Sequence, residues 1–224
     1  MLSVIVPVRN GGAFVEEALK SAFLQPEVAE VIVVDDGSSD DSAERAAGVT
    51  GTLVLRTAPR GPGAARNTGV RCARQPFVAF LDADDVWLPS KSPLQLLALA
   101  APGWSYALCA FEHFLHADAG IPSGARLASL TGAQRAPLLS SLVVRRDLFL
   151  ETGGFDEALI TAEDVDWFLR ARALGFEERF VERVLLRKRL HSHNLSLTSP
   201  GNTRRLFDVI RRHRHGSAAN GGAQ

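Results

Sequence analysis

The stretch LSVIVPVRNGG, residues 2–12, joins a short apolar run to a pair of glycines. The run Leu2–Val8 is rich in β-branched residues, which predicts a buried strand, and Gly11 and Gly12 predict a turn after it. The following residues, Phe14–Phe23, carry apolar side chains at helical spacing with charged side chains on the other side. The chain is therefore predicted to open with a strand, a turn and an amphipathic helix.

The same unit repeats through the first half of the chain. Apolar runs predict further strands at Val31–Val34, Leu53–Leu55 and Phe77–Leu81, and helices are predicted at Ser39–Ala47 and Ala64–Arg74. Strands that alternate with helices form parallel sheets with helices on both faces. We therefore predict an α/β, Rossmann-like domain with a mostly parallel central sheet. Ligands bind such sheets outside the carboxyl ends of the strands.

After about Ala101 the alternation becomes irregular. The predicted elements are strands at Tyr106–Phe114, Leu142–Val144 and Phe180–Leu190, helices at Glu163–Ala173 and Arg204–Arg212, and a frayed tail from His215 to Gln224. We expect residues 1–101 and 102–198 to form two halves of one domain. We expect residues 199–224 to form a basic helix and a flexible tail.

The composition is that of a globular domain. The chain has 224 residues, of which 46% are apolar and 22% charged, and this excludes a disordered or fibrous protein. Its two cysteines, Cys72 and Cys109, are too few for a disulfide framework, which favours a reducing, cytoplasmic location. We expect neither an export signal nor a membrane span, because no segment stays apolar for about 18 residues.

Basic residues gather late in the chain although the formal net charge is zero. Between Arg179 and His215 ten Lys and Arg stand against Glu182 and Asp208, a balance of +8, so the rest of the chain carries −8. This segment favours contact with an anionic group: a diphosphate, a lipid phosphate or the inner face of an anionic membrane. The alternative is an ordinary solvated helix. Because the segment lacks interleaved aromatic residues, we expect no nucleic-acid partner.

Acidic side chains follow two of the predicted strands. Asp82, Asp84 and Asp85 crowd the loop after the fourth strand and repel one another, and bound Mg²⁺ or Mn²⁺ relieves such repulsion best. The alternative is a helix cap with solvated neighbours. Asp35 and Asp36 end the second strand, where they fit either an Asx-type turn or acceptors for the N–H edge of a nucleobase.

Seven motifs stand in order along the chain. They are Ser3–Asn10 (SVIVPVRN), Val31–Asp40 (VIVVDDGSSD), Gly63–Gly69 (GAARNTG), Phe80–Asp85 (FLDADD), Gly153–Asp156 (GGFD), the pair Glu163–Asp164, and Arg189-x-His191 with Asn194 and Ser196 behind it. Together these motifs resemble the signatures of family 2 glycosyltransferases with the GT-A fold. The resemblance extends to about Thr198, and so covers most of the chain.

The resemblance implies a site for a nucleotide-diphosphate sugar. It implies that Asp36 holds the base, commonly uracil, and that Arg66 lies near the phosphates; the alternative for Arg66 is an exposed helix arginine. It also implies Mg²⁺ or Mn²⁺ on the donor diphosphate. The implied donor-binding residues are Pro7, Val8, Arg9, Asn10, Asp36, Arg66, Asp82 and Ala83, and the implied metal-site residues are Asp84, Asp82 and His191.

Transfer to a hydroxyl requires a base that accepts its proton. The resemblance implies that Asp164 lies beneath the reactive carbon of the sugar, so Asp164 is the candidate base. Glu163 is a candidate for binding acceptor hydroxyls or for replacing Asp164. The alternative is that this pair only places negative charge in the first turn of a helix, worth about 0.3–1 kcal/mol.

Histidine and tryptophan residues complete the set of candidates. His193 lies on the side opposite His191 if this stretch is extended, so only one of the two can face the site. Trp87 and Trp167 are candidates for stacking on sugar rings, although Trp167 also fits a core position.

We predict an inverting, metal-dependent glycosyltransferase that moves one sugar, from a UDP-sugar by preference, to an acceptor hydroxyl. The acceptor classes are a glycan, a lipid-linked glycan or a small molecule, in polysaccharide or glycoconjugate biosynthesis. The Gln-x-x-Arg-Trp sequence of processive synthases is missing, so we expect one transfer per binding event. Residues 116–134 match no known pattern, so the acceptor stays open, as does the oligomeric state, a homodimer included.

Three alternatives are open at this stage. A haloacid-dehalogenase-like phosphatase would use Asp82 as nucleophile and Asp84 as general acid, but its motif normally lies on the first strand. A dinucleotide-binding oxidoreductase is disfavoured because Arg66 stands where the third glycine of its motif belongs. A non-catalytic nucleotide-sugar-binding protein would bind donor with metal and release no nucleoside diphosphate.

Overall fold

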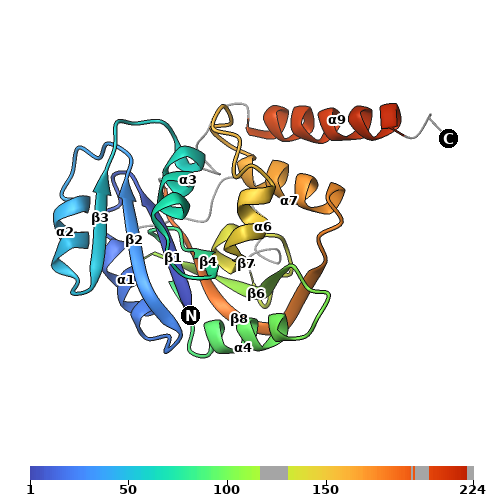
Figure 1. Ribbon diagram of the computed structural model, residues 1–224. Coiled ribbons are helices and arrows are strands. Elements are labelled where there is room, and N and C mark those ends of the chain that lie inside the picture. The colour runs from blue at the N-terminus through green and yellow to red at the C-terminus, as the bar shows by residue number, and fades with distance from the viewer. Residues whose placement is uncertain (117–130, 193, 195–201, 221–224) are drawn as a thin grey trace.

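One eight-stranded sheet forms the centre of the protein, in the strand order β3-β2-β1-β4-β7-β6-β8-β5 (Figure 1). This computed structural model describes residues 1–116, 131–192, 194 and 202–220, with side chains of the last range described for 204–213. The strands are β1 (Leu2–Val8), β2 (Val28–Asp35), β3 (Thr52–Arg56), β4 (Phe77–Phe80), β5 (Val86–Trp87), β6 (Tyr106–Leu115), β7 (Val143–Arg145) and β8 (Glu178–Leu190). The helices are α1 (Val15–Phe23), α2 (Ser42–Gly48), α3 (Pro62–Cys72), α4 (Lys91–Ala100), the 3-10 turn η1 (Leu139–Ser141), α6 (Arg146–Glu151), α7 (Glu163–Ala173) and α9 (Asn202–Asn220).

The strand directions bring several strand ends to one edge of the sheet. β1 is parallel to both β2 and β4, so the carboxyl ends of these strands lie together. β7 is antiparallel to β4 and to β6, and β8 is parallel to β6, so β8 ends at the same edge as β4. The residues that follow β8 therefore meet the loop after β4, although 107 positions separate Asp84 from His191.

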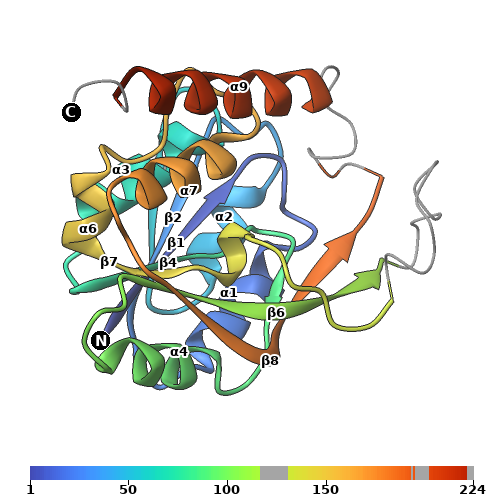
Figure 2. The ribbon, with the colours of Figure 1, turned by 90° about the vertical axis from the view of Figure 1, so that its right-hand side faces the viewer.

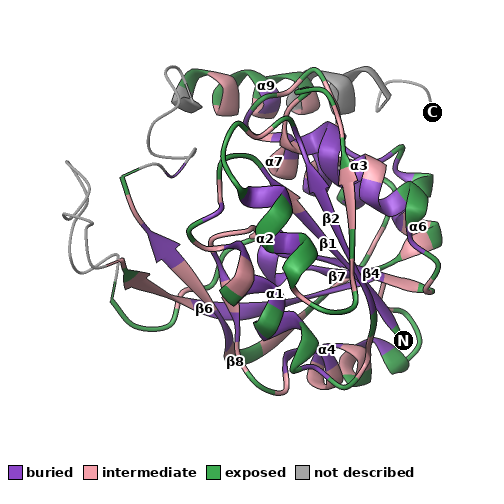
Figure 3. Ribbon diagram, turned by 90° about the vertical axis from the view of Figure 1, so that its left-hand side faces the viewer, coloured by how far each residue is buried: buried purple, intermediate pink, exposed green. Residues whose placement is uncertain are grey.

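Helices cover both faces of the sheet. On one face α1, α2 and α4 pack on residues such as Val4 and Val33, and on the other α3, α6 and α7 pack on residues such as Ile5 and Ile32. Because alternate residues of a strand point to opposite faces, the central strands are apolar on both sides. Figure 2 shows α4 below the sheet, α6 and α7 above it and α9 across the top, and Figure 3 shows the central strands buried between these layers.

The predicted α/β class is confirmed, and the sheet is mixed. Every strand and helix predicted before Ala101 is present, as are the later strands and the helix Glu163–Ala173. Of the seven strand pairings in the described residues, four are parallel and three antiparallel. The antiparallel pairings all involve β5 or β7, which are short strands.

Four elements of the structure are absent from the prediction, namely β5, α4, α6 and the 3-10 turn η1. The pattern of α4 is misleading because Lys91, Ser92 and Gln95 are buried while Leu97 is 71% exposed. Hydrogen bonds make this burial of polar groups favourable, since Gln95 Nε2 donates to the carbonyl oxygens of Ala107 at 3.0 Å and Ser141 at 2.7 Å. The helical period of α4 is therefore present, but its inner face is polar.

The C-terminal helix is longer than predicted. α9 extends to Asn220, so the prediction of a frayed tail from His215 is wrong up to that residue. Ala218 and Ala219 have the highest intrinsic helix propensity, which favours this extension. Residues 221–224 lie outside the described part of the chain.

Helix α3 lies unusually close to β1 because Gly69 stands at their contact. A Cβ added at Gly69 would lie 2.4 Å from Ile5 Cγ2 and 3.4 Å from Val34 Cγ2. Both neighbours are fully buried core residues, so they have little space into which to move. This close packing fixes the position of α3, which carries Arg66 and Asn67.

Gly69→Ala is expected to lower the free energy of unfolding by about 1–3 kcal/mol, because the added methyl group overpacks the α3–β1 contact. Gly48→Ala in α2 is the matched control, since nothing lies within 4 Å of its added Cβ. Urea unfolding followed by circular dichroism measures both variants. If Gly69→Ala proves as stable as Gly48→Ala, the packing argument is wrong.

Candidate active site

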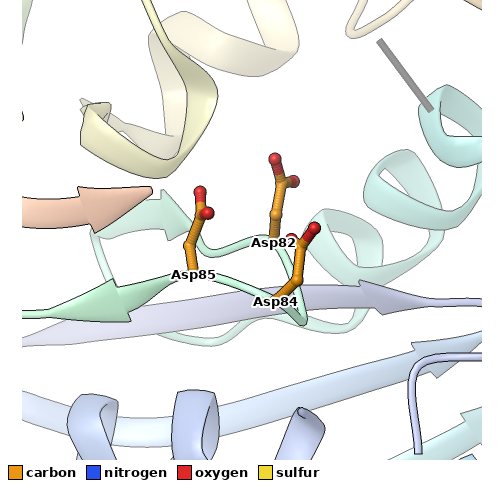
Figure 4. Close-up of side chains that lie close together, drawn as sticks. All are labelled: Asp82, Asp84 and Asp85. Atoms are coloured by element: carbon orange, nitrogen blue, oxygen red, sulfur yellow. The ribbon is translucent and has the colours of Figure 1, made fainter. Parts of the chain in front are cut away.

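Three carboxylates gather in the loop that follows β4. Asp82, Asp84 and Asp85 each offer one oxygen atom, and these atoms lie within 4.8 Å of one another. Figure 4 shows the three side chains rising from this loop with their carboxylates toward the same side. The structure thus brings together the three aspartates that the sequence analysis expected to crowd this loop. Crowded carboxylate oxygens are the donor set that Mg²⁺ and Mn²⁺ prefer.

The end of β8 holds Asp84 in place. His191 Nε2 and Asn194 Nδ2 each lie 2.9 Å from Asp84 Oδ2. Arg189 Nε donates to the backbone carbonyl of Asp84 at 2.9 Å. His191, predicted as a metal or diphosphate contact, therefore lies directly beside the acidic loop. His193, the other candidate of this stretch, lies outside the described residues.

Asp85 is the buried member of the acidic loop. Its Oδ1 accepts the backbone N–H of Arg189 at 3.2 Å, and the residue has no exposed surface. Among the described residues its Oδ2 has no hydrogen-bond partner, and Lys188 Nζ lies 3.8 Å from it. Burial raises the pKa of Asp85 to about 7, Lys188 opposes this rise, and the other two aspartates add to it. A buried carboxylate oxygen without a hydrogen bond, beside two further carboxylates, fits a site for a divalent cation.

Arg66 joins the acidic loop to α7. Its Nη2 donates to Asp82 Oδ1 and its Nη1 donates to Glu163 Oε1, each at 2.7 Å. Burial alone would lower the pKa of Arg66, but the two carboxylates outweigh it and raise the pKa above its ordinary value. Because Arg66 is only 5% exposed, its alternative interpretation as an exposed helix arginine is wrong.

The ion pair with Arg66 lowers the pKa of Asp82, whereas it raises the pKa of Arg66 itself. Burial alone would raise the pKa of Asp82, but Arg66 and then Lys188 lower it below its ordinary value. Asp82 is therefore held ionised. Its backbone N–H also donates to Ser140 Oγ at 3.0 Å, which fixes the start of the loop.

The first turn of α7 presents Glu163 and Asp164 to this cluster. Ala162, directly before them, has a φ of 66°, which is rare for a residue with a side chain and often accompanies functional sites. Burial raises the pKa of Asp164, Asp82 adds to the rise, and the backbone N–H of Val165, at 2.8 Å from Asp164 Oδ1, opposes it. Burial likewise raises the pKa of Glu163, against the effect of Arg66. A carboxylate with a raised pKa is the stronger proton acceptor.

The two acids that end β2 have different surroundings. Asp36 is buried, and its Oδ1 and Oδ2 accept the backbone N–H groups of Arg60 at 2.7 Å and Gly61 at 2.8 Å. Asp36 therefore anchors the loop that leads into α3, and each oxygen keeps a second lone pair. Asp35 Oδ1 accepts the backbone N–H of Ser38, three residues on, at 2.9 Å, whereas an Asx turn would use the N–H two residues on.

The loop after β1 lies between the loops that follow β2 and β4. Asn10 has a φ of 53°, and its Oδ1 accepts the backbone N–H of Ser39 at 2.8 Å. A Cβ added at Gly11 would lie 3.5 Å from Ala83 Cβ, so this loop approaches the acidic loop closely. The edge of the sheet thus gathers the residues predicted for the donor: Pro7, Val8, Arg9, Asn10, Asp36, Arg66, Asp82 and Ala83.

Asn67 is a structural residue to which the sequence analysis gives no role. Its Oδ1 accepts the backbone N–H of Phe155 and its Nδ2 donates to the Phe155 carbonyl oxygen, both at 2.9 Å. Gly154 has a φ of 74°, and a Cβ there would lie 2.6 Å from Asn67 Oδ1, so only glycine fits. This contact docks residues 153–156 on α3 beside Arg66. The position of Asn67 within the motif Gly63–Gly69 is the only signal for it in the sequence.

Comparison with known proteins decides the family. The sequence profile of Glycosyl transferase family 2 matches residues 3–136. The chain belongs to this family. The family assignment excludes the phosphatase and the dinucleotide-binding oxidoreductase that the sequence analysis left open.

Named relatives of this family 2 domain include a succinoglycan biosynthesis protein and a further glycosyltransferase. Succinoglycan biosynthesis protein ExoU of Rhizobium meliloti (strain 1021) is 32% identical over 203 residues, which cover 80% of this chain and 58% of ExoU. Glycosyltransferase AglE of Haloferax volcanii is 28% identical over 201 residues, which cover 82% of this chain and 65% of AglE. The chain thus spans less than two thirds of the length of these relatives.

Solved structures share the fold of this family 2 domain. S. aureus TarS 1–349 in complex with UDP-GlcNAc matches with a TM-score of 0.75 at 20% identity, covering 95% of this chain and 65% of TarS 1–349. The mannosyltransferase PcManGT from Pyrobaculum calidifontis, in complex with GDP-Man and Mn²⁺, matches with a TM-score of 0.64 at 22% identity, covering 86% and 58% of the two chains. These likenesses establish the GT-A-like fold.

The two tryptophan candidates of this family 2 domain are core residues. Trp87 is 2% exposed and its Nε1 donates to the Ser140 carbonyl oxygen at 2.9 Å. Trp167 has no exposed surface and its Nε1 donates to Thr152 Oγ1 at 2.8 Å. The prediction that either stacks on a sugar ring is therefore wrong, because neither ring face reaches solvent.

The basic segment of this family 2 domain is not one surface. Lys188 and Arg189 are largely buried beside the acidic loop, and Arg187 pairs with Glu112 at 3.3 Å. Arg179 and Arg183 of β8 are exposed, as are Arg204, Arg211 and Arg212 of α9. Among the described residues, no helix has both the length and the apolar character needed to cross a membrane.

Arg66→Met is expected to lower the free energy of unfolding by about 3–5 kcal/mol, because it leaves Asp82 and Glu163 buried without their cation. Arg71→Met, on the same helix with its side chain 55% exposed, is the control and is expected to cost about 0–1 kcal/mol. Denaturant unfolding without added metal compares the two. Similar small losses in both variants would show that the Arg66 bridge is not structural.

Proposed function

We propose that the chain transfers one sugar from a nucleotide-diphosphate sugar to an acceptor hydroxyl, with inversion and with Mg²⁺ or Mn²⁺ as cofactor. The observation that carries this proposal is the acidic loop joined through Arg66 to the start of α7. A metal-binding cluster and a candidate base, Asp164, are thereby held at one edge of the sheet. Such transfer needs charge stabilisation on the leaving group and a proton acceptor for the incoming hydroxyl.

The metal would be held by the carboxylates of the acidic loop. Asp84 and Asp82 are the proposed ligands together with His191, and Asp85 joins the same cluster of oxygens. When bound, the cation would neutralise charge that gathers on the departing nucleoside diphosphate. The Mn²⁺ in the PcManGT complex supports this assignment.

The donor is proposed to lie along the loops that follow β1, β2 and β4. Asp36 is proposed to accept a hydrogen bond from the base through lone pairs that Arg60 and Gly61 leave free. We favour UDP as the nucleotide because uracil presents an N–H to such an acceptor, and the UDP-GlcNAc complex of TarS supports this choice. GDP is the alternative, supported by the GDP-Man complex of PcManGT.

Asp164 is proposed as the base that accepts the proton of the acceptor hydroxyl. Its burial and raised pKa favour proton uptake, and its Oδ1 is oriented by the N–H of Val165. Glu163 is engaged by Arg66, so we propose that it positions Arg66 rather than binding acceptor hydroxyls. The acceptor is proposed to be a growing glycan, because ExoU acts in succinoglycan biosynthesis. Residues 117–130, which belong to the stretch expected to select the acceptor, lie outside the described residues.

Asp84→Asn and Asp164→Asn are expected to separate donor binding from transfer. Asp84→Asn should abolish Mn²⁺-dependent binding of UDP and GDP, because a metal ligand is lost. Asp164→Asn should keep that binding and slow transfer by about 10²–10⁴-fold. Calorimetry with Mn²⁺ measures binding, and release of nucleoside diphosphate from UDP-GlcNAc and GDP-Man with oligosaccharide acceptors measures transfer.

Asp147→Asn, an exposed carboxylate on α6, is the control for both measurements. Equal loss of binding in Asp84→Asn and Asp164→Asn would contradict the proposed roles. Donor binding in the unmodified protein without nucleoside diphosphate release on any acceptor would favour the non-catalytic binding protein instead.

We further propose that the outer side of α9 contacts anionic lipid. Val209 is buried against the domain, while Arg204, Phe207 and Arg211 recur at helical spacing on the outer side, and Phe207 is 60% exposed. An exposed aromatic ring flanked by arginines is typical of helices that lie in the headgroup region of anionic membranes.

Arg204→Gln combined with Arg211→Gln is expected to reduce flotation of the protein with vesicles that contain about 30% phosphatidylserine, since each arginine near an anionic surface contributes about 1 kcal/mol. Arg56→Gln combined with Arg183→Gln, two exposed arginines elsewhere, removes the same charge and should leave flotation unchanged. Flotation that does not depend on anionic lipid would refute the contact.

A further inference from the structure

Lys188 is a lysine that the proposed function does not use, and it lies against the acidic loop. Its side chain is 17% exposed, and its Nζ is 3.8 Å from the Oδ2 of Asp85, an atom without a hydrogen bond among the described residues. The backbone N–H of the next residue, Arg189, donates to the other oxygen of Asp85. β8 therefore presents one backbone donor and one ammonium group to the same buried carboxylate.

The charge of Lys188 acts on the whole acidic loop. Asp85, Asp82 and Asp84 all attract the ammonium group, and together they outweigh its burial and raise the pKa of Lys188 above its ordinary value. Arg66 also contacts the loop, through the carboxylate of Asp82, and Arg189 contacts it through the backbone carbonyl of Asp84. The negative charge of the three carboxylates is therefore partly offset by neighbouring cations.

We propose that Lys188 is an internal counter-cation that holds the acidic loop together without metal and makes metal binding depend on the donor diphosphate. This inference rests on the proposed function. A divalent cation that enters the loop alone meets the positive charge of Lys188, which weakens its binding. A nucleoside diphosphate brings negative charge to the same place, which offsets that repulsion. Lys188 is thus a positioning residue that favours joint binding of metal and donor.

Lys188→Met tests the inference through Mn²⁺ binding, measured by the electron paramagnetic resonance signal of free Mn²⁺ with and without UDP. Without UDP the variant is expected to bind Mn²⁺ about tenfold more tightly than the unmodified protein, because a nearby positive charge is gone. With UDP the two proteins should differ less. The factor by which UDP tightens Mn²⁺ binding should therefore shrink in the variant.

Thermal unfolding without nucleotide gives a second readout. In chelator, Lys188→Met is expected to unfold at a lower temperature than the unmodified protein, because the carboxylates of its acidic loop repel one another. Added Mn²⁺ should raise the unfolding temperature more in the variant than in the unmodified protein. The double variant Asp85→Asn, Lys188→Met removes both partners of the ion pair. The double variant should be more stable in chelator than Lys188→Met, and it should not show the tighter Mn²⁺ binding of Lys188→Met. It serves as the test protein if Lys188→Met does not fold.

Arg183→Met is the control, since it removes one positive charge from an exposed position of the same strand. It should leave Mn²⁺ binding unchanged with and without UDP. If Lys188→Met binds Mn²⁺ no more tightly than Arg183→Met, the inference is overturned while the proposed function stands. If the unmodified protein binds no Mn²⁺ even with UDP or GDP, the proposed metal site itself fails.

Discussion

Carboxylates crowded at one edge of a sheet repel one another unless cations or hydrogen-bond donors lie between them. This constraint shapes the described site more than any other interaction. Among the described residues, the partners of the three carboxylates all lie outside the loop. They are Arg66 of α3 for Asp82, His191 and Asn194 for Asp84, and Lys188 and the backbone of Arg189 in β8 for Asp85. The conformation of the loop therefore depends on the packing of α3 and β8 on the sheet.

The sheet topology makes this compensation possible. Because β7 runs antiparallel between β4 and β6, the later strands β6 and β8 again run in the direction of β4. A single reversed strand thus brings the end of β8 to the edge where the first half of the chain has its loops. Asn67 ties the same two halves together through Phe155, on the other side of Arg66. The site belongs to both halves of the domain.

The sequence is sufficient to predict features that depend on neighbouring residues. Alternating strands and helices and the acidic cluster after β4 follow from local pattern, and the structure contains them. Features that depend on distant contacts are not accessible in this way. The inner face of α4 is polar because Gln95 reaches carbonyl groups on β6 and η1, and no local pattern specifies those partners.

Lysine and arginine residues illustrate the same limit. Lys188 and Arg189 lie in a run of basic residues whose simplest interpretation is an exposed surface, yet both are turned toward acids of other elements. Their role depends on β8 passing beside the acidic loop, which is a property of topology and not of composition. The basic segment therefore separates into counter-charges inside the domain and exposed arginines on β8 and α9.

Arg66 shows that a residue implied to lie near the donor phosphates also has structural contacts inside the domain. Both terminal nitrogens of its guanidinium are engaged, one by Asp82 and one by Glu163. These two contacts use two of the five N–H donors of the guanidinium, and among the described residues its Nε has no hydrogen-bond partner. We propose that Arg66 also acts on a bound donor through Asp82, whose ionised state it favours. By the same argument Glu163 orients Arg66, which leaves Asp164 as the acid of this pair that is free of the Arg66 bridge.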